Sequence, residues 1–88
     1  MRVVVVTRDN TDYSRAVQMF LDDFTRRTGR NLEVLDPDTG DGESFCRTYD
    51  IVEYPTVIAL SDGGQMQNVW AGRELPTINE VSYYVSQN

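Results

Sequence analysis

The chain has no histidine and no lysine, and it carries a single cysteine, Cys46. With one cysteine it cannot close a disulfide within itself, and without histidine it cannot assemble a Cys/His zinc site. The lack of histidine also excludes acid–base and nucleophilic chemistry built on an imidazole. From these absences we expect no metal site, no cofactor and no catalytic residue.

Positive charge is scarce as well, because eight arginines stand against fourteen acidic residues and give a net charge of −6. A nucleic-acid partner needs a positive face to meet its phosphates, so we expect none. No apolar run approaches the length of a membrane span, and residues 1–9 turn polar too soon for a signal peptide. We therefore expect no membrane partner and a cytoplasmic setting.

The remaining composition, 40% hydrophobic and 25% charged, fits one small globular domain over residues 1–88. Residues 3–6 are four valines in a row, which is typical of a strand buried on both faces. A helix is predicted next, because apolar residues recur at three- and four-residue steps. Its stripe comprises Tyr13, Ala16, Val17, Phe20, Leu21 and Phe24. Gly29 supplies its left-handed stop.

The second half of the chain also contains predicted strands and helices. The pattern predicts a strand over 32–35, an acidic loop over 38–43, a short helix over 44–49, and strands over 56–60 and 66–71 joined by a hairpin turn at 61–64. Pro76 suits the first turn of a closing helix, and Thr77 with Glu80 has capping-box spacing. The order is β-α-β-α-β-β-α, an α/β fold whose four-stranded mixed sheet is flanked by three helices.

Tyr54, Pro55 and Thr56 lead directly into the third predicted strand. A proline that opens a β-branched strand predicts a cis bond between Tyr54 and Pro55. This placement resembles the thioredoxin and glutaredoxin superfamily, in which a cis-proline loop packs against a two-cysteine motif at the start of the first helix. The resemblance covers essentially the whole chain and implies a thioredoxin-like fold, with the cis-proline before the third strand.

Where that family has its cysteines, this chain has Thr11-Asp12-Tyr13-Ser14. The family's chemistry needs one thiolate to attack and a second thiol to resolve the mixed disulfide. A threonine or serine hydroxyl stays protonated near neutral pH and forms no disulfide. We therefore predict a redox-inactive variant.

In the family, the residue before the cis-proline pairs through its main chain with extended substrates. The resemblance thus implies a module that binds a protein or peptide against the cis-proline loop and the first-helix start. The candidate binding residues are Arg8, Thr11, Asp12, Tyr13, Ser14, Tyr54 and Pro55. Tyr13, Tyr54 and Trp70 either form an aromatic rim there or simply pack.

Other interpretations apply to the same residues. The first predicted helix could be capped by Asn10, Thr11 or Asp12, or the unpaired amides of its first turn could bind an anion. Arg8 corresponds to the basic residue that helps hold glutathione in glutaredoxins, so glutathione is an alternative ligand. The alternative function is a thiol–disulfide oxidoreductase or a glutathione-linked enzyme, which would act through Cys46 or Ser14.

Asn10-Thr11-x-x-Ser14 followed by Arg-Ala also resembles the helix start of the cyanobacterial clock adaptor family. Those thioredoxin-fold modules lack the redox cysteines and bind other proteins.

Two further features have alternatives. Cys46 is either a small buried hydrophobe or a surface thiol activated by Arg47. The acidic stretch of Asp36, Asp38, Asp41 and Glu43 is either a solvated connector or a calcium site, although it lacks the spacing of the twelve-residue calcium loop.

Overall fold

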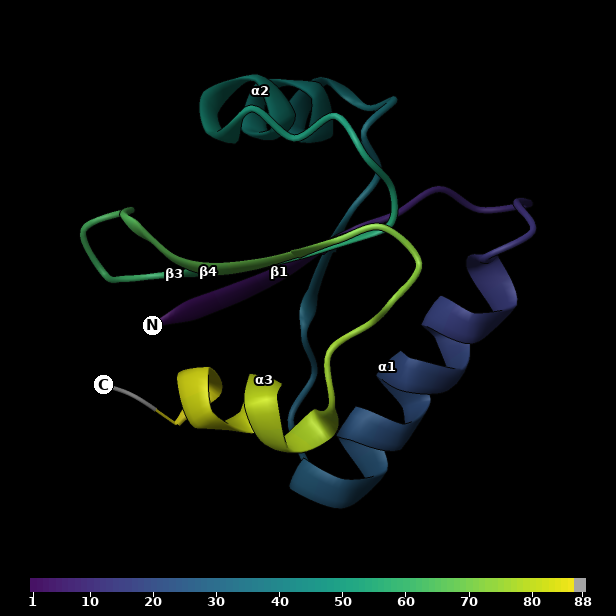
Figure 1. Ribbon diagram of the computed structural model, residues 1–88, viewed down its shortest axis with the longest axis vertical. Coiled ribbons are helices and arrows are strands. Elements are labelled where there is room, and N and C mark those ends of the chain that lie inside the picture. The colour runs from purple at the N-terminus through teal and green to yellow at the C-terminus, as the bar shows by residue number, and fades with distance from the viewer. Residues whose placement is uncertain (87–88) are drawn as a thin grey trace.

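The computed structural model describes residues 1–86, and within them the order predicted from the sequence is confirmed. The elements are β1 (Arg2–Val6), α1 (Ser14–Thr28), β2 (Glu33–Leu35), α2 (Gly40–Tyr49), β3 (Thr56–Leu60), β4 (Met66–Ala71) and α3 (Ile78–Val85). The four strands form one mixed sheet in the order β2-β1-β3-β4. α2 lies on one side of this sheet, and α1 and α3 lie on the other (Figure 1).

The strand pairing follows from the connections. β1 and β2 are parallel, as the α1 crossover requires, with Val5 opposite Val34. β1 and β3 are antiparallel, with Val4 opposite Ile58, and the tight turn after β3 makes β4 antiparallel as well. This turn is closed by a hydrogen bond from the Gly64 amide to the Ser61 carbonyl at 2.9 Å, as the hairpin signal predicted.

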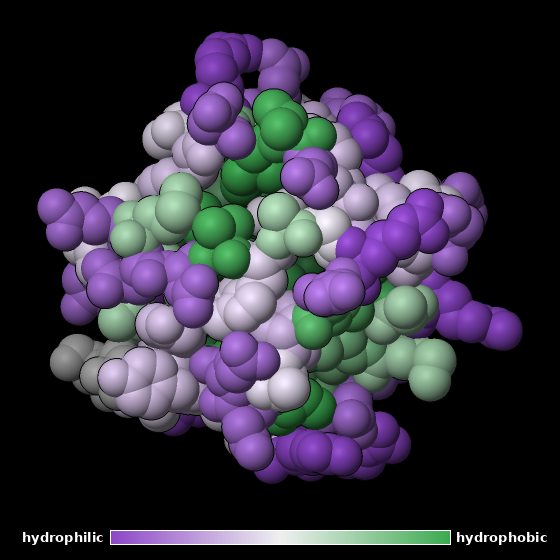
Figure 2. Space-filling model, in the orientation of Figure 1, coloured by the Kyte–Doolittle hydropathy of each residue, from purple (hydrophilic) through white to green (hydrophobic). Residues whose placement is uncertain are grey.

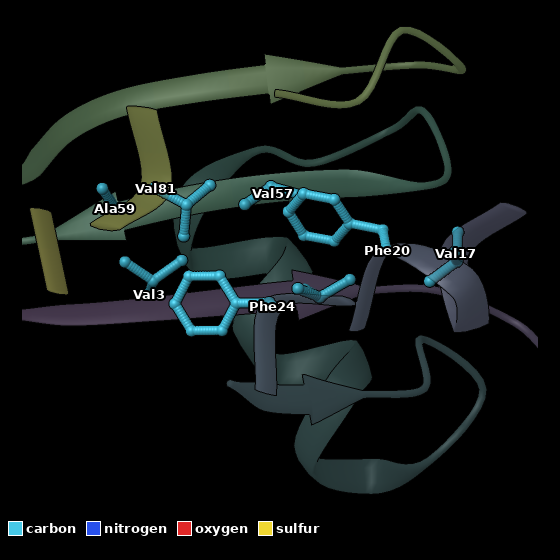
Figure 3. Close-up of a cluster of buried hydrophobic side chains, with 8 residues drawn as sticks. Val3, Val17, Phe20, Phe24, Val57, Ala59 and Val81 are labelled. Atoms are coloured by element: carbon cyan, nitrogen blue, oxygen red, sulfur yellow. The ribbon is translucent and has the colours of Figure 1, made fainter. Parts of the chain in front are cut away.

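Side chains of β1 alternate between two cores, which explains its unbroken run of valines. Val3 and Val5 face α1 and α3, where they pack with the cluster drawn in Figure 3: Val17, Phe20, Phe24, Val57, Ala59 and Val81. Val4 and Val6 face α2, where they pack with Phe45, Cys46, Ile51, Ile58 and Leu60. Burying one such side chain stabilises the fold by roughly 1.5–3 kcal/mol, so the central strands hold the two layers together.

Helix α2 begins four residues before the predicted start at Ser44, so residues 40–43 are helical and not part of a loop. The Thr39 side chain caps the helix by accepting a hydrogen bond from the Gly42 amide at 3.0 Å. Asp41 and Glu43 then lie in the first turn, where acidic side chains complement the helix dipole.

Helix α3 begins with the predicted capping box. The Thr77 hydroxyl accepts from the Glu80 amide, and the Glu80 carboxylate accepts from the Thr77 amide. The prediction that Pro76 lies in the first turn is wrong, because Thr77 is the N-cap and Pro76 precedes it as a buried residue. None of the helices formed by residues 1–86 has the length and apolar character needed to cross a membrane.

Candidate functional site

The candidate site lies at one end of the sheet, where three strands have neighbouring ends. Val6 is opposite Thr56, and Thr56 is opposite Ala71. The residues that follow β1, precede β3 and follow β4 therefore meet at this end. Arg8, the Tyr54–Pro55 pair and Gly72 belong to these three segments. The Tyr54–Pro55 peptide bond is cis.

Two contacts from consecutive residues join the Pro55 loop to the segment that leads into α1. The Gly72 amide donates a hydrogen bond to the Pro55 carbonyl at 2.9 Å. The Arg73 guanidinium pairs with the Asp12 carboxylate, with 2.6 Å between Nη2 and Oδ2. Pro55 and Asp12 therefore lie in the same region, and they do not face opposite sides of the molecule.

The main chain of Tyr54 has no hydrogen-bond partner in the described part of the chain. Within residues 1–86 neither its amide nor its carbonyl takes part in a hydrogen bond, whereas the Pro55 and Glu53 carbonyls accept from Gly72 and Thr56. Beside Tyr54 lies a cleft of about 490 Å³ lined by Glu53, Tyr54, Ala71, Gly72, Arg73 and Glu74. We call this the Tyr54 cleft. An unpaired amide and carbonyl beside a cleft can pair with an extended chain.

Arg8 fixes the side chain of Tyr54. Its guanidinium lies over the Tyr54 ring, 4.6 Å from the ring centroid, which is within cation–π range. It also forms a two-pronged ion pair with Asp38, with Nε–Oδ2 at 3.0 Å and Nη2–Oδ1 at 3.1 Å. Hydrogen bonding to Arg8 lowers the pKa of the Asp38 carboxyl, and the same bond raises the pKa of Arg8. Arg8 thus joins the loop before α2 to the loop before β3.

The start of α1 differs from the predicted cap. The N-cap is Tyr13, and no side chain caps the helix, so the prediction that Asn10, Thr11 or Asp12 caps it is wrong. The Thr11 hydroxyl instead donates to the Arg8 carbonyl at 3.4 Å, and the Ser14 hydroxyl donates to the Thr11 carbonyl at 2.8 Å. Short polar side chains often bond to local backbone in this way.

The aromatic residues do not form one rim. Tyr13 and Trp70 pack against the cluster on the α1 and α3 side of the sheet, whereas Tyr54 packs against the α2 side. The Trp70 ring contacts Tyr84 edge to face, with centroids 5.7 Å apart. Trp70 is therefore part of the packing of α3 on the sheet, and Tyr54 is the aromatic residue of the cleft.

Cys46 lies closer to the site than its sequence position suggested. It is 8% exposed, which confirms the buried interpretation, and it packs in the cluster against which Tyr54 rests. Partial burial raises the pKa of Tyr54, and the neighbouring Cys46 raises it further. Arg47 forms an ion pair with Glu43 across one helical turn. No sequence pattern indicates this proximity, because it depends on how α2 packs on the sheet.

The acidic stretch forms contacts with the rest of the chain as well as within itself. Asp36 accepts a hydrogen bond from the Asp38 amide at 2.8 Å, and the Asp38 carboxylate is paired with Arg8. Asp41 and Glu43 lie in the first turn of α2. Among residues 1–86 no three acidic or cysteine side chains are grouped as metal ligands would be.

The layout defines a protein of thioredoxin-like fold, and solved structures agree. Thioredoxin 1 from the thermophilic eubacterium Thermosipho africanus TCF52B is similar over 97% of this chain and 90% of that one, with a TM-score of 0.66 and 19% sequence identity. A malarial protein is similar over 94% of this chain and 90% of its own, with a TM-score of 0.65 and 17% sequence identity.

At such identities the likeness shows the fold alone. No family model and no curated protein matches the chain. The two structures give no support to the resemblance to the clock adaptor family.

Proposed function

We propose that this chain is a redox-inactive thioredoxin-like domain that binds an extended segment of a partner protein in the Tyr54 cleft, against the start of α1. The observation that carries the proposal is the unpaired main chain of Tyr54, at the end of the sheet where Arg8 contacts the Tyr54 ring and Arg73 pairs with Asp12, just before α1. Strand addition to such a main chain needs no reactive side chain. A binding role is therefore compatible with the loss of both cysteines.

The surroundings of Tyr54 favour binding over a purely structural role. The Arg8 guanidinium holds the ring in place, and the Gly72 amide holds the Pro55 carbonyl, so the Tyr54 backbone is ordered before a ligand arrives. Preorganisation reduces the entropy lost on association. Tyrosine is also a frequent anchor in interfaces, because it combines a large apolar ring with a polar end.

An oxidoreductase or a glutathione-linked enzyme is supported less well. Such an activity would use the thiol of Cys46 or the hydroxyl of Ser14, yet Cys46 is buried and the Ser14 hydroxyl donates to the Thr11 carbonyl. Reactive thiols need an exposed, electropositive environment. Glutathione would also compete with Asp38 for the Arg8 guanidinium.

Two measurements test the proposal. The first is a disulfide-reduction assay on the wild type and on Cys46→Ser, where we expect no activity in either protein. Activity in the wild type that disappears in Cys46→Ser would favour the enzyme.

The second is an amide chemical-shift titration with an uncharged extended hexapeptide and with the same peptide N-methylated at alternate amides, which blocks main-chain pairing. We expect the unmodified peptide to shift the Tyr54 amide and the methylated one to leave it unchanged. Equal shifts with both peptides would contradict pairing through the main chain.

The cytoplasmic setting stays a prediction.

A further inference from the structure

Exposed hydrophobic side chains gather beside β4, on the face of the sheet that carries α2. Within residues 1–86 six large hydrophobic side chains are exposed, and three of them, Val52, Met66 and Val69, line one groove of about 360 Å³. Val52 is 78% exposed and Val69 is 41% exposed. Figure 2 shows hydrophobic surface between α2 and the β3–β4 hairpin. We call this hollow the β4 groove.

The register of the sheet explains why the groove is there. Val69 is opposite Ile58 and Ala71 is opposite Thr56, so Val69 and Ala71 lie on the α2 face. Among residues 1–86 α2 is the one helix on that face, and it packs over β1 and β3, so Ile58 is fully buried while Val69 is not. β4 is also an edge strand, with no partner on its outer side within the described sheet. An exposed edge strand beside apolar side chains is a template for another strand.

The rim of the groove is acidic. Asp50 and Glu53 line it, and no arginine does. Neither carboxylate forms an ion pair within residues 1–86, whereas six other acidic residues do: Asp12, Asp23, Glu33, Asp38, Glu43 and Asp62. The groove therefore presents apolar surface flanked by uncompensated negative charge, which is complementary to a basic partner.

From this complementarity we infer that the β4 groove binds an extended segment of a partner protein that carries alternating apolar side chains flanked by lysine or arginine. The segment adds as a fifth strand along β4, its apolar side chains rest on Val52 and Val69, and its basic residues meet Asp50 and Glu53. A second copy of this chain fits less well, because each copy carries a net charge of −6 and like charges repel. This surface is separate from the Tyr54 main chain, although Glu53 and Ala71 line both hollows.

The test uses a capped peptide of alternating valine and threonine with a lysine at each end, titrated into the 15N-labelled protein. We expect shifts at β4 amides, and affinity that falls as salt rises. Val69→Thr keeps a β-branched residue in the strand but removes apolar contact, and it should weaken binding roughly five- to tenfold. Glu53→Gln should weaken binding severalfold at low salt and little at high salt. Met19→Ser, at a side chain 65% exposed on α1, is the matched control and should change nothing.

The outcomes separate the alternatives. Equal affinity for wild type and Val69→Thr, or no binding at millimolar peptide, would overturn the inference. Self-association in sedimentation that disappears in Val69→Thr would assign the groove to a second copy and would also overturn it. Arg8→Gln alters the surroundings of Tyr54 but not the lining of the β4 groove, so it should leave the affinity of this peptide unchanged. A failure of the β4 groove proposal can therefore be told apart from a failure of the proposed function at Tyr54.

Discussion

Helix propensity alone favours replacing Gly42 by alanine, but the close contact of Gly42 with the Asp36 carbonyl predicts that this change destabilises the protein. An ideal Cβ at Gly42 would lie 1.8 Å from the Asp36 carbonyl oxygen, whereas real Cβ atoms essentially never come closer than 3.0 Å. The start of α2 and the Asp36 carbonyl would have to separate by at least 1.2 Å, the difference between those distances. That carbonyl also accepts from the Thr39 amide at 3.1 Å and the Thr39 hydroxyl at 2.7 Å.

We expect Gly42→Ala to destabilise the protein by about 2–3 kcal/mol. Overpacking typically costs about 1–3 kcal/mol, and the better helix propensity of alanine returns at most about 1 kcal/mol. Further loss comes from the weakened Thr39 hydrogen bonds. A chain of this size has a total stability of roughly 4–13 kcal/mol, so the melting temperature should fall by about 10 °C or more.

Gly40→Ala is the matched control, because nothing lies within 4 Å of a Cβ at Gly40 in the same helical turn. It should stabilise the protein by about 0.5 kcal/mol, since alanine restricts the unfolded chain more than glycine does. Urea unfolding, followed by far-UV circular dichroism and by the fluorescence of the single tryptophan, measures both changes. Equal stabilities for the two variants would refute the packing argument.

Three further predictions concern single side chains. The Thr7 hydroxyl is buried without a hydrogen-bond partner among residues 1–86, so Thr7→Val should raise the free energy of unfolding by about 1 kcal/mol. A lower free energy of unfolding in the urea assay would show that the hydroxyl has a partner. Cys46→Ser places a hydroxyl in an apolar cluster and should cost about 1–3 kcal/mol in the same assay; no change would contradict its burial. Arg8→Gln removes the partner that lowers the Asp38 pKa, so NMR titration should find that pKa higher in the variant, and an unchanged value would argue against the ion pair. Because folding lowers the Asp38 pKa, the Arg8–Asp38 ion pair contributes to stability above about pH 4, and this contribution is lost as the pH falls through the pKa of Asp38 in the folded protein. Arg8→Gln should abolish this pH dependence.

The parts of the fold that could be predicted depend on local pattern. The four valines of β1 indicated a strand with two buried faces, and Thr77 with Glu80 indicated the α3 cap, because both signals are complete within a few residues. The α2 start was missed for the opposite reason. It depends on the approach of Gly42 to the Asp36 carbonyl, and a glycine next to acids is also typical of a loop.

For the site, the sequence placed residues in one region but did not give their contacts. Several side chains at the start of α1 could have capped the helix, and the choice among them depends on backbone geometry such as the positive φ of Asn10. The Asp38 partner of Arg8 and the Arg73 partner of Asp12 are distant in sequence, at separations of 30 and 61 residues. No periodicity or motif encodes such pairs, so only the folded chain reveals them.

Hydrogen exchange at the Tyr54 amide shows whether a bound peptide pairs with this main chain, because the amide has no partner within residues 1–86. The uncharged extended hexapeptide should bind and slow the exchange of this amide at least tenfold, while the Gly72 amide, already bonded to Pro55, changes little. Binding that leaves Tyr54 exchanging at its free rate would show that the ligand does not pair with this main chain, and the proposed function would then be wrong.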